Sequence, residues 1–281
     1  MENHVVDAPA DSDLAVAAIQ MVSSTSVDEN MKDAAVLIKQ AAKQGARLIL
    51  LPEYFCLMGK QDTDKLAIRE TDGDGPLQRF LSRQAARHGI WLIGGTIPLD
   101  SGISDRIYNT CLVYGPDGKR LARYDKMHLF GFDNGKDVFS EADTIVPGRP
   151  VATGFASPAG PVMLSICYDL RFPELYRTQV PANLIVVPSA FTFTTGRAHW
   201  EILLKARAVE NQCYVLAAAQ GGKHESGRRT WGHSVLIDPW GTVVHELAEG
   251  PGVVQGVVSI ERLNRIRTSL PALTHRVLFH A

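Results

Sequence analysis

Stretches of continuous apolar residues alternate along the chain with amphipathic stretches, and this alternation limits the folds that the chain can adopt. Residues 14–20 and 47–51 are predicted strands, and the second is apolar after its first residue, as expected for a strand buried on both faces of a sheet. Between them, residues 28–44 carry apolar side chains at helical spacing, and Gly45 follows where a helix C-cap glycine is common. A strand, a helix and a second apolar strand in succession predict an α/β protein.

The alternation occurs twice, and each time a β-hairpin follows it. The first half continues with a helix at 76–88, a strand at 90–97 and a hairpin at 108–124. The second half contains strands at 162–166, 184–187 and 213–219, helices at 173–177 and 198–212, and a hairpin at 234–247. A ten-residue pattern, A-x-L-I-x-x-P-x-x-F, also recurs at 46–55 and 182–191. We therefore predict a four-layer α-β-β-α sandwich with two pseudo-symmetric half-sheets packed face to face.

The length of 281 residues suits one or two domains of about 150 residues each. Because the two halves are expected to share one core, we predict a single domain over residues 13–281. Residues 1–12 are short and polar, and we predict a disordered tail there.

The composition excludes several classes of partner. With 29 basic and 30 acidic residues the net charge is −1, so the chain offers no bulk attraction to nucleic acid or to an anionic membrane. No apolar run is long enough to span a bilayer, and the acidic start is unlike a secretory signal. The four cysteines form no C-x-x-C pair, which disfavours a zinc knuckle or a thioredoxin motif. These features predict a cytoplasmic protein with free thiols whose partner is a small molecule.

One of those thiols lies at a position suited to catalysis. Cys167 ends a predicted apolar strand and precedes a turn into a helix, so we expect it at the carboxyl edge of a sheet, where α/β proteins bind ligands. A buried structural cysteine is an equally common outcome at such a position. Cys111 and Cys213 lie inside apolar strands, which favours core packing for both.

A nucleophilic thiol needs a group that accepts its proton. Glu53 follows another apolar strand, within Leu-Pro-Glu-Tyr-Phe. An apolar pocket would raise the pKa of this carboxyl toward neutrality and suit it to general acid–base catalysis. The alternative bases are four histidines at predicted loops or element ends: His128, His199, His224 and His233.

Lys126 stands just beyond the first hairpin, within Tyr-Asp-Lys-Met-His-Leu-Phe. Most single lysines are solvated surface charges. Beside a thiol, an ammonium group favours the thiolate and stabilises the oxyanion that forms when the thiolate attacks a carbonyl.

Three sequence blocks resemble the signature motifs of the nitrilase superfamily of carbon–nitrogen hydrolases. They are Leu-Leu-Pro-Glu-Tyr-Phe around Glu53, Tyr-Asp-Lys-Met-His-Leu-Phe around Lys126, and Ser-Ile-Cys-Tyr-Asp-Leu-Arg-Phe-Pro-Glu-Leu around Cys167. The blocks occur in the order typical of the superfamily, and the resemblance runs from about Leu14 to Arg276. It implies the α-β-β-α sandwich, a homodimer or larger homo-oligomer, and a site that uses no metal ion and no organic cofactor.

The resemblance also implies a role for each residue that matches a motif. Glu53 corresponds to the general base, Lys126 to the oxyanion lysine and Cys167 to the nucleophile of a catalytic triad. Glu141 matches a second glutamate that positions the lysine and the substrate, and the backbone N–H of Tyr168 matches the other oxyanion donor. The histidines then take supporting roles.

Segments of the second half resemble an amidase branch that includes the deaminated glutathione amidases, with the omega-amidases as the nearest competitor. Three such segments are Pro188-Ser-Ala-Phe191, Gly232-His-Ser234 and Asp238-Pro-Trp-Gly241. This implies hydrolysis of a linear amide, R–CO–NH₂ or R–CO–NH–R′, through a cysteine thioester, with release of ammonia or an amine and a carboxylic acid.

Substrates of this branch carry carboxylates, so the pocket needs cations. The candidate substrate-binding residues are two arginines and two aromatic residues: Arg171, Arg197, Phe191 and Trp200. A salt bridge from Arg171 to Glu174 is the structural alternative for the first, and core packing is the alternative for the aromatic pair. Arg228 and Arg229, in a glycine-rich loop, either line the pocket entrance or are solvated.

Other functions remain open from the sequence. An N-carbamoyl amino acid hydrolase or an aliphatic nitrilase would use the same triad, although true nitrilases favour Cys-Trp-Glu where this chain has Cys167-Tyr-Asp. A thiol redox sensor or a non-catalytic scaffold is the reading from a different class, in which Cys56 would approach Cys167 in space.

Overall fold

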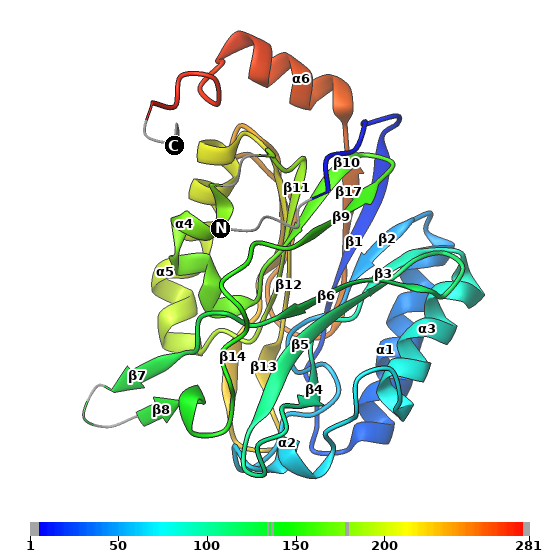
Figure 1. Cartoon of the computed structure of the whole chain (residues 1–281), viewed down its shortest axis with the longest axis vertical. Helices are drawn as coiled ribbons and strands as arrows, with labels where there is room; N and C mark the ends of the chain where they lie inside the picture. The colour runs from blue at the N-terminus through cyan, green and yellow to red at the C-terminus, as the bar shows by residue number, and fades with distance from the viewer. Residues whose placement is uncertain (1–5, 134, 136–137, 178–179, 278–281) are drawn as a thin grey trace.

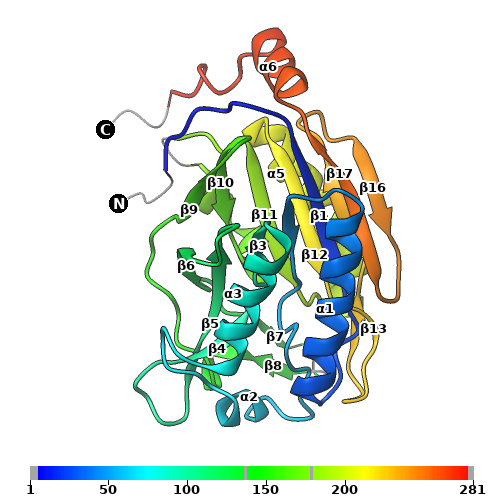
Figure 2. The same cartoon turned by 90° about the vertical axis from the view of Figure 1, so that its right-hand side faces the viewer.

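Two β-sheets stack face to face, and helices cover the outer face of each (Figures 1 and 2). The computed structural model describes residues 6–133, 135, 138–177 and 180–277. Helices α1 (Val27–Lys43) and α3 (Pro76–His88) pack on the first sheet, and α5 (Phe193–Asn211) packs on the second. The predicted four-layer α-β-β-α sandwich is confirmed.

The first sheet has the strand order β17-β1-β2-β3-β5-β4, and β6 pairs with β5. Its strands are β1 (Leu14–Gln20), β2 (Leu48–Leu50), β3 (Trp91–Ile93), β4 (Ile97–Asp100), β5 (Ile107–Tyr114), β6 (Arg120–Asp125) and β17 (Gly252–Val258). β1, β2 and β3 run parallel to one another, and β17 closes the β1 edge as an antiparallel strand.

The second sheet has the order β16-β15-β12-β11-β10-β9. Its strands are β9 (Gly154–Ser157), β10 (Gly160–Leu164), β11 (Leu184–Ser189), β12 (Tyr214–Ala219), β15 (Ser234–Ile237) and β16 (Val243–Leu247). β10, β11 and β12 run parallel, with antiparallel neighbours at both sides. Both sheets therefore follow one pairing plan: an antiparallel edge strand, three parallel strands, then antiparallel strands.

The parallel strands are apolar throughout because both of their faces are buried. In β1, Val16 and Ala18 belong to the cluster between the two sheets, whereas Ala17 and Ile19 belong to the cluster under α1 and α3. Leu48 and Ile49 of β2 divide in the same way. Alternate side chains of one strand thus fill two different layers of core.

Smaller elements occupy the ends of the sandwich. They are the hairpins β7–β8 (Gly131–Asp133, Val138–Ser140) and β13–β14 (Gly221–Lys223, Arg229–Trp231), the helices α2 (Asp64–Ala67), α4 (Pro173–Tyr176) and α6 (Ile260–Ser269), and the 3₁₀ turns η1 (Glu141–Asp143) and η2 (Cys167–Arg171). The two hairpins and α2 lie at the end of the molecule opposite α6 (Figure 1).

Two predicted boundaries are wrong. Helix α5 begins at Phe193 rather than at 198, because the side chain of Thr192 accepts a hydrogen bond from the Thr195 amide and caps the helix. The strand predicted at 90–97 is split into β3 and β4, because Gly95 turns the chain with a φ of +57°.

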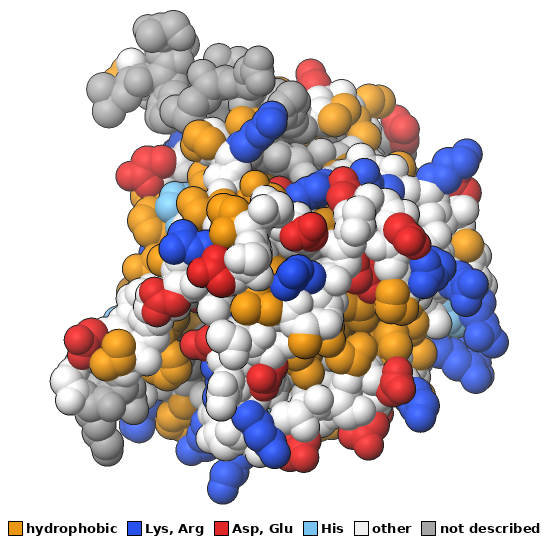
Figure 3. Space-filling model, turned by 60° about the horizontal axis from the view of Figure 1, so that its bottom comes forward, with side chains coloured by type: hydrophobic (Ala, Val, Ile, Leu, Met, Phe, Trp, Pro, Cys, Tyr) orange, Lys and Arg blue, Asp and Glu red, His pale blue; other side chains and the backbone are white. Residues whose placement is uncertain are grey.

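The surface matches the near-neutral composition. Acidic and basic side chains are interspersed over the centre of the face in Figure 3, while Lys and Arg gather toward one edge. At the predicted tail, the amides of Asp11 and Ser12 donate to the Pro158 carbonyl, and residues 1–5 lie outside the described residues. In the described chain, no helix combines the length and apolar character that a membrane crossing requires.

Candidate functional site

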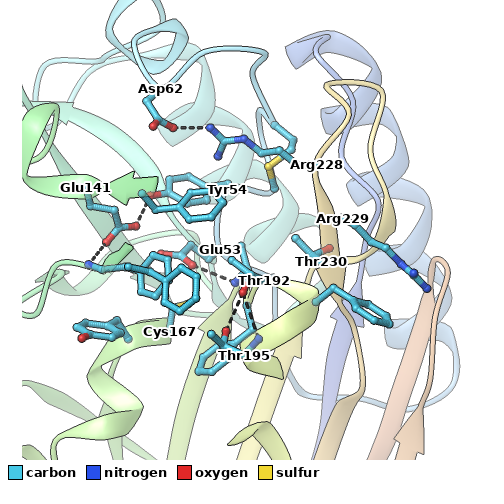
Figure 4. A pocket seen from close by; sticks show the side chains of 18 of the residues that line it. Glu53, Tyr54, Asp62, Glu141, Cys167, Thr192, Thr195, Arg228, Arg229 and Thr230 are labelled. Atoms are coloured by element: carbon cyan, nitrogen blue, oxygen red, sulfur yellow. Dashed lines mark hydrogen bonds and ion pairs between the residues drawn. The ribbon is translucent and has the colours of Figure 1, made fainter. Parts of the chain in front are cut away.

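A cavity of about 570 Å³ opens at the carboxyl ends of β2, β10 and β11 (Figure 4). The side chains that line it include Glu53, Glu141 and Cys167, so the structure brings together residues from three distant parts of the sequence. This is the edge of an α/β sheet where ligand sites are expected.

Glu53 follows β2 and is buried, with three donors around its carboxylate. Oε1 accepts from Lys126 Nζ at 2.9 Å and from Asn109 Nδ2 at 2.9 Å, and Oε2 accepts from the Ala190 amide at 3.0 Å. Burial raises the pKa of Glu53 above its usual value, although the Lys126 ammonium opposes the rise. The carboxylate is therefore held in one orientation and takes up a proton more readily than an exposed glutamate.

Lys126 directly follows β6 and has no exposed surface. Its Nζ lies 2.9 Å from Glu53 Oε1 and 2.7 Å from Glu141 Oε2. Burial alone would lower the pKa of this ammonium, but the two carboxylates raise it well above its usual value. Lys126 is thus a permanent cation between two anions.

Glu141 is in turn held by groups other than the lysine. Its Oε2 accepts from the Phe130 amide at 2.7 Å, and its Oε1 accepts from the Tyr54 hydroxyl at 2.9 Å. Burial raises the pKa of Glu141, but Lys126 outweighs this effect and the net pKa is lowered. The two glutamates differ accordingly, since Glu141 keeps its charge while Glu53 is the easier one to protonate.

Cys167 is the first residue of η2, just past β10, and its backbone adopts a left-handed φ of +48°. A non-glycine residue is strained in this backbone conformation, and strained residues are concentrated at functional sites. Burial raises the pKa of the thiol well above its usual value, and the Glu53 charge adds to the rise while Lys126 opposes it. The resting group is therefore a thiol that needs a base before it can attack.

A buried aspartate holds the turn that carries Cys167. Asp169 Oδ2 accepts from the Ile166 amide at 2.8 Å and from the Tyr124 hydroxyl at 2.7 Å. Its Oδ1 accepts from the His128 amide at 3.0 Å and lies 2.7 Å from His128 Nδ1. These contacts tie η2 to the residue before Cys167, to β6 and to the loop that follows β6.

Comparison with known proteins agrees with this arrangement. Residues 15–268 match the family pattern described as carbon-nitrogen hydrolase. The chain belongs to the carbon–nitrogen hydrolase family. Deaminated glutathione amidase of Synechocystis sp. is 40% identical over 266 residues, covering 93% of this chain and 97% of that protein. Omega-amidase NIT2 of Mus musculus is 38% identical over 264 residues, covering 93% and 94%.

A solved structure extends the likeness to the fold. Saccharomyces cerevisiae Nit3, a member of branch 10 of the nitrilase superfamily, matches with a TM-score of 0.84 at 32% identity, covering 92% of this chain and 95% of that chain. The predicted membership of the nitrilase superfamily is therefore confirmed. This carbon–nitrogen hydrolase is an enzyme, and both of these relatives are named as amidases.

Of the four predicted substrate-binding residues of the hydrolase, two line the cavity and two do not. Arg171 and Phe191 line the cavity, and the Arg171 guanidinium lies over the Phe191 ring at 5.6 Å. Arg171 contacts His199 rather than forming the alternative salt bridge to Glu174. Tyr168 also lines the cavity, with its ring under the same guanidinium at 5.7 Å.

Arg197 and Trp200 do not reach the cavity. Arg197 is exposed on α5, and it is absent from the cavity lining. Trp200 is buried behind Phe191, with ring centroids 4.8 Å apart, and its Nε1 donates to the His233 carbonyl at 2.8 Å. Because α5 already begins at Phe193, Arg197 lies within the helix, on its exposed side, rather than in a loop beside the cavity.

None of the four candidate histidines, all in the described part of the hydrolase, lines the cavity. His224 is buried between the Ser23 carbonyl and the Thr230 hydroxyl, at 2.9 Å and 2.8 Å, and burial lowers its pKa. His128, as described, contacts Asp169. The alternative of a Cys–His pair therefore has no geometric support.

The remaining cysteines are buried away from the cavity. Burial raises the pKa of Cys56 to about 12 and that of Cys213 to about 12, so both are unreactive thiols at neutral pH. In the described chain no group of three or more His, Cys, Asp or Glu side chains is arranged to hold a metal ion.

Sequence reasoning missed the groups that complete the site: Asn109, Tyr54, Asp169 and the Ala190 amide. The internal repeat carried a signal for two of them. Tyr54 and Ala190 occupy the same place in the ten-residue pattern, so each follows the second parallel strand of its own sheet. Stacking the two sheets brings these equivalent ends together, and the Ala190 amide thereby reaches Glu53.

Proposed function

We propose that this hydrolase cleaves a small carboxylate-bearing amide, such as deaminated glutathione, through a thioester on Cys167. The observation that supports this most directly is the buried Lys126 ammonium, bonded to Glu53 and Glu141, two carboxylates that line the same cavity as Cys167. A thiol, a base with a raised pKa and a fixed cation are the groups that amide attack requires.

In the first half-reaction Glu53 takes the proton of the Cys167 thiol as the sulfur attacks the carbonyl carbon. The Lys126 ammonium and the backbone N–H of Tyr168 stabilise the oxyanion of the tetrahedral intermediate. Glu53 then gives its proton to the amide nitrogen, the C–N bond breaks, and ammonia or an amine leaves. The product on the enzyme is a thioester.

In the second half-reaction Glu53 takes a proton from a water molecule, whose oxygen attacks the thioester carbonyl. The same two donors stabilise the second oxyanion. Collapse of the intermediate breaks the C–S bond, the proton returns to the sulfur, and a carboxylic acid is released. Glu141, with its lowered pKa, keeps the lysine charged and in place through both halves.

Arg171 is the proposed anchor for the substrate carboxylate. It lines the cavity four residues beyond Cys167, and its guanidinium is packed over two aromatic rings that hold it in position. A planar guanidinium suits bidentate recognition of a carboxylate. Phe191 supplies the apolar wall beneath it.

Replacement of the nucleophile tests the proposal. Cys167→Ala is expected to abolish release of ammonia or amine from deaminated glutathione and from α-ketoglutaramate, with an unchanged melting temperature. Cys213→Ala removes a buried thiol outside the cavity and is expected to retain activity. Glu53→Gln is expected to abolish turnover as well, because its carboxylate takes the thiol proton in the first half-reaction. The thioester on Cys167, visible as a mass increase, is expected in the native enzyme quenched during turnover. Full turnover by Cys167→Ala, or an adduct on another residue, would overturn the mechanism.

An omega-amidase or an N-carbamoyl amino acid hydrolase remains the second candidate, and the same assay with N-carbamoyl amino acids separates it. A redox sensor is disfavoured because Cys56 is buried with a pKa raised to about 12 and lies outside the cavity. The homodimeric assembly and the cytoplasmic location stay predictions, which size-exclusion chromatography and fractionation address.

A further inference from the structure

The lysine and the cysteine of the proposed mechanism belong to different sheets. Lys126 directly follows β6 of the first sheet, and Cys167 opens η2 just beyond β10 of the second. When the sulfur attacks a carbonyl carbon, the oxygen of that carbonyl has to lie within hydrogen-bond distance of the ammonium. Contacts between the two sheets must therefore fix the separation of these two groups.

Asp169 makes contacts of this kind. It lies two residues after Cys167, and its side chain is fully buried. Its Oδ2 accepts at 2.7 Å from the hydroxyl of Tyr124, two residues before Lys126. Its Oδ1 accepts from the amide of His128 at 3.0 Å and lies 2.7 Å from His128 Nδ1, two residues after Lys126. One carboxylate thus bridges η2 to the chain on both sides of Lys126.

The ring of His128 adds a further contact with the segment that carries the nucleophile. It is stacked on the ring of Phe172, the residue after η2, with centroids 3.8 Å apart and planes 8° apart. Because an ionised carboxylate only accepts, Nδ1 carries the hydrogen in the contact with Asp169. The imidazole is therefore fixed by a hydrogen bond within η2 and by packing just beyond it.

The same carboxylate also holds its own turn, because Oδ2 accepts from the Ile166 amide at 2.8 Å. A role confined to the turn would need this contact alone. The hydroxyl of Tyr124 and the amide and ring of His128 supply three contacts more, and all three come from the segment around Lys126. A buried carboxylate is costly unless donors surround it, so these contacts are also what allows Asp169 to remain charged there.

We propose that Asp169 is a positioning residue for amide hydrolysis: by bonding to the chain on both sides of Lys126, it sets the place of the ammonium relative to the sulfur of Cys167. This inference rests on the proposed function and adds to it a residue that touches no reacting atom. Asp169, Tyr124 and His128 are absent from the cavity lining, so they act on the reaction only through the groups that they hold.

Tyr124→Phe tests the bridge and leaves the Ile166 contact of the turn in place. It is expected to lower kcat for deaminated glutathione about 10-fold with little change in KM, because the ammonium shifts while the substrate-binding side chains stay. Asp169→Asn puts a donor where an acceptor is needed and is expected to cost about 100-fold. Tyr214→Phe changes a buried tyrosine of β12 outside the cavity and should keep the native kcat.

The His128 side of the bridge is tested by loss and rescue. His128→Ala removes the ring contact with Asp169 and should lower kcat about 10-fold. In His128→Asn the side-chain amide can donate in place of Nδ1, so part of the lost activity should return. Melting temperatures verify that each variant is folded at the assay temperature.

Alkylation of Cys167 by iodoacetamide separates positioning from a loss of structure, because this reaction forms no oxyanion. If the bridge acts through the ammonium, Tyr124→Phe keeps the native alkylation rate while its kcat falls. A loosened turn would change both rates together. It would also expose the buried thiols of Cys111 and Cys213 to the reagent, and mass spectrometry locates the label.

Three results would overturn the inference. They are a native kcat in Tyr124→Phe or in His128→Ala, a fall in kcat matched by an equal change in the alkylation rate, and an effect on KM alone. In each of these cases the native enzyme still cleaves deaminated glutathione, and the proposed function stands. Failure of the proposed function is distinct, because the native enzyme then cleaves no amide, and the inference falls with it.

Discussion

At the scale of single residues, the site depends on how Glu53 is solvated. Three donors replace the water that an exposed carboxylate would bind, and the Lys126 ammonium is one of them. Burial still dominates, so the pKa of Glu53 is raised while that of Glu141 is lowered beside the same lysine. Their surroundings thus make Glu53 the easier carboxylate to protonate and keep Glu141 charged.

The raised pKa of Glu53 predicts the direction in which kcat/KM changes with pH, and kinetics can check it. The basic form exists above this pKa and is lost as the pH falls through it, so the acid limb of kcat/KM is expected above pH 4.5. Asn109→Leu removes one donor to the carboxylate and should move the limb upward by about one pH unit. Asn211→Leu, which alters a buried amide within α5, should leave the limb in place. An unmoved limb in Asn109→Leu would contradict the assignment of Glu53 as the base.

At the scale of elements, the site is made where strands end. Glu53 and Ala190 follow the second parallel strands of the two sheets, and Cys167 follows β10. The positions of these residues depend on how tightly the chain packs just beyond each strand. Gly95 shows this for the segment that carries Glu53. A Cβ atom at Gly95 would lie 2.1 Å from the carbonyl oxygen of Pro52, the residue before Glu53.

Two glycines with nearly the same φ separate the effect of packing from that of backbone strain. Gly89 has a φ of +61° and open space around its Cβ position, whereas Gly95 has a φ of +57° and the close contact with Pro52. Gly89→Ala is expected to lower the free energy of unfolding by about 1–2 kcal/mol, the cost of a left-handed alanine. Gly95→Ala should cost at least about 2 kcal/mol more and also lower kcat, because Pro52 carries Glu53 with it. Urea denaturation and steady-state kinetics measure both, and equal losses in the two variants would refute the packing argument.

At the scale of the whole molecule, the two halves are interlocked rather than merely stacked. The edge strand of the first sheet is β17, which pairs antiparallel with β1 from Leu14↔Val258 to Gln20↔Gly252. The equivalent edge strand of the second sheet is β9, which immediately precedes β10 in the chain. The first sheet is therefore complete only when the end of the chain has returned to it.

Two valines of β17 test how much this closing strand contributes. Val254 is fully buried in the cluster between the sheets, and Val257 is 48% exposed. Val254→Ala is expected to lower the free energy of unfolding by roughly 2–3 kcal/mol, from two lost methyl groups and the cavity they leave. Val257→Ala should stay within about 0.5 kcal/mol of the native protein. Similar losses at both positions would mean that β17 does not close the core.

The sequence by itself determined the local elements and the chemical identity of the site. Apolar runs with helical stretches between them predicted β1, α1 and β2, because hydrophobic spacing decides which local conformation can bury its side chains. The motifs around Glu53, Lys126 and Cys167 indicated the chemistry through their resemblance to a known family, whereas the residue types alone left a histidine base open.

The tertiary structure alone decided which groups meet. The Asn109 side chain and the Ala190 amide reach Glu53 only because two sheets stack with their strand ends aligned, and no local pattern encodes that alignment. It also decided that Arg197 lies on the exposed side of α5, outside the cavity lining. The physical reason is that spacing along the chain specifies how a segment buries its own side chains, whereas hydrogen bonds across 50 or more residues depend on the packing of all layers at once.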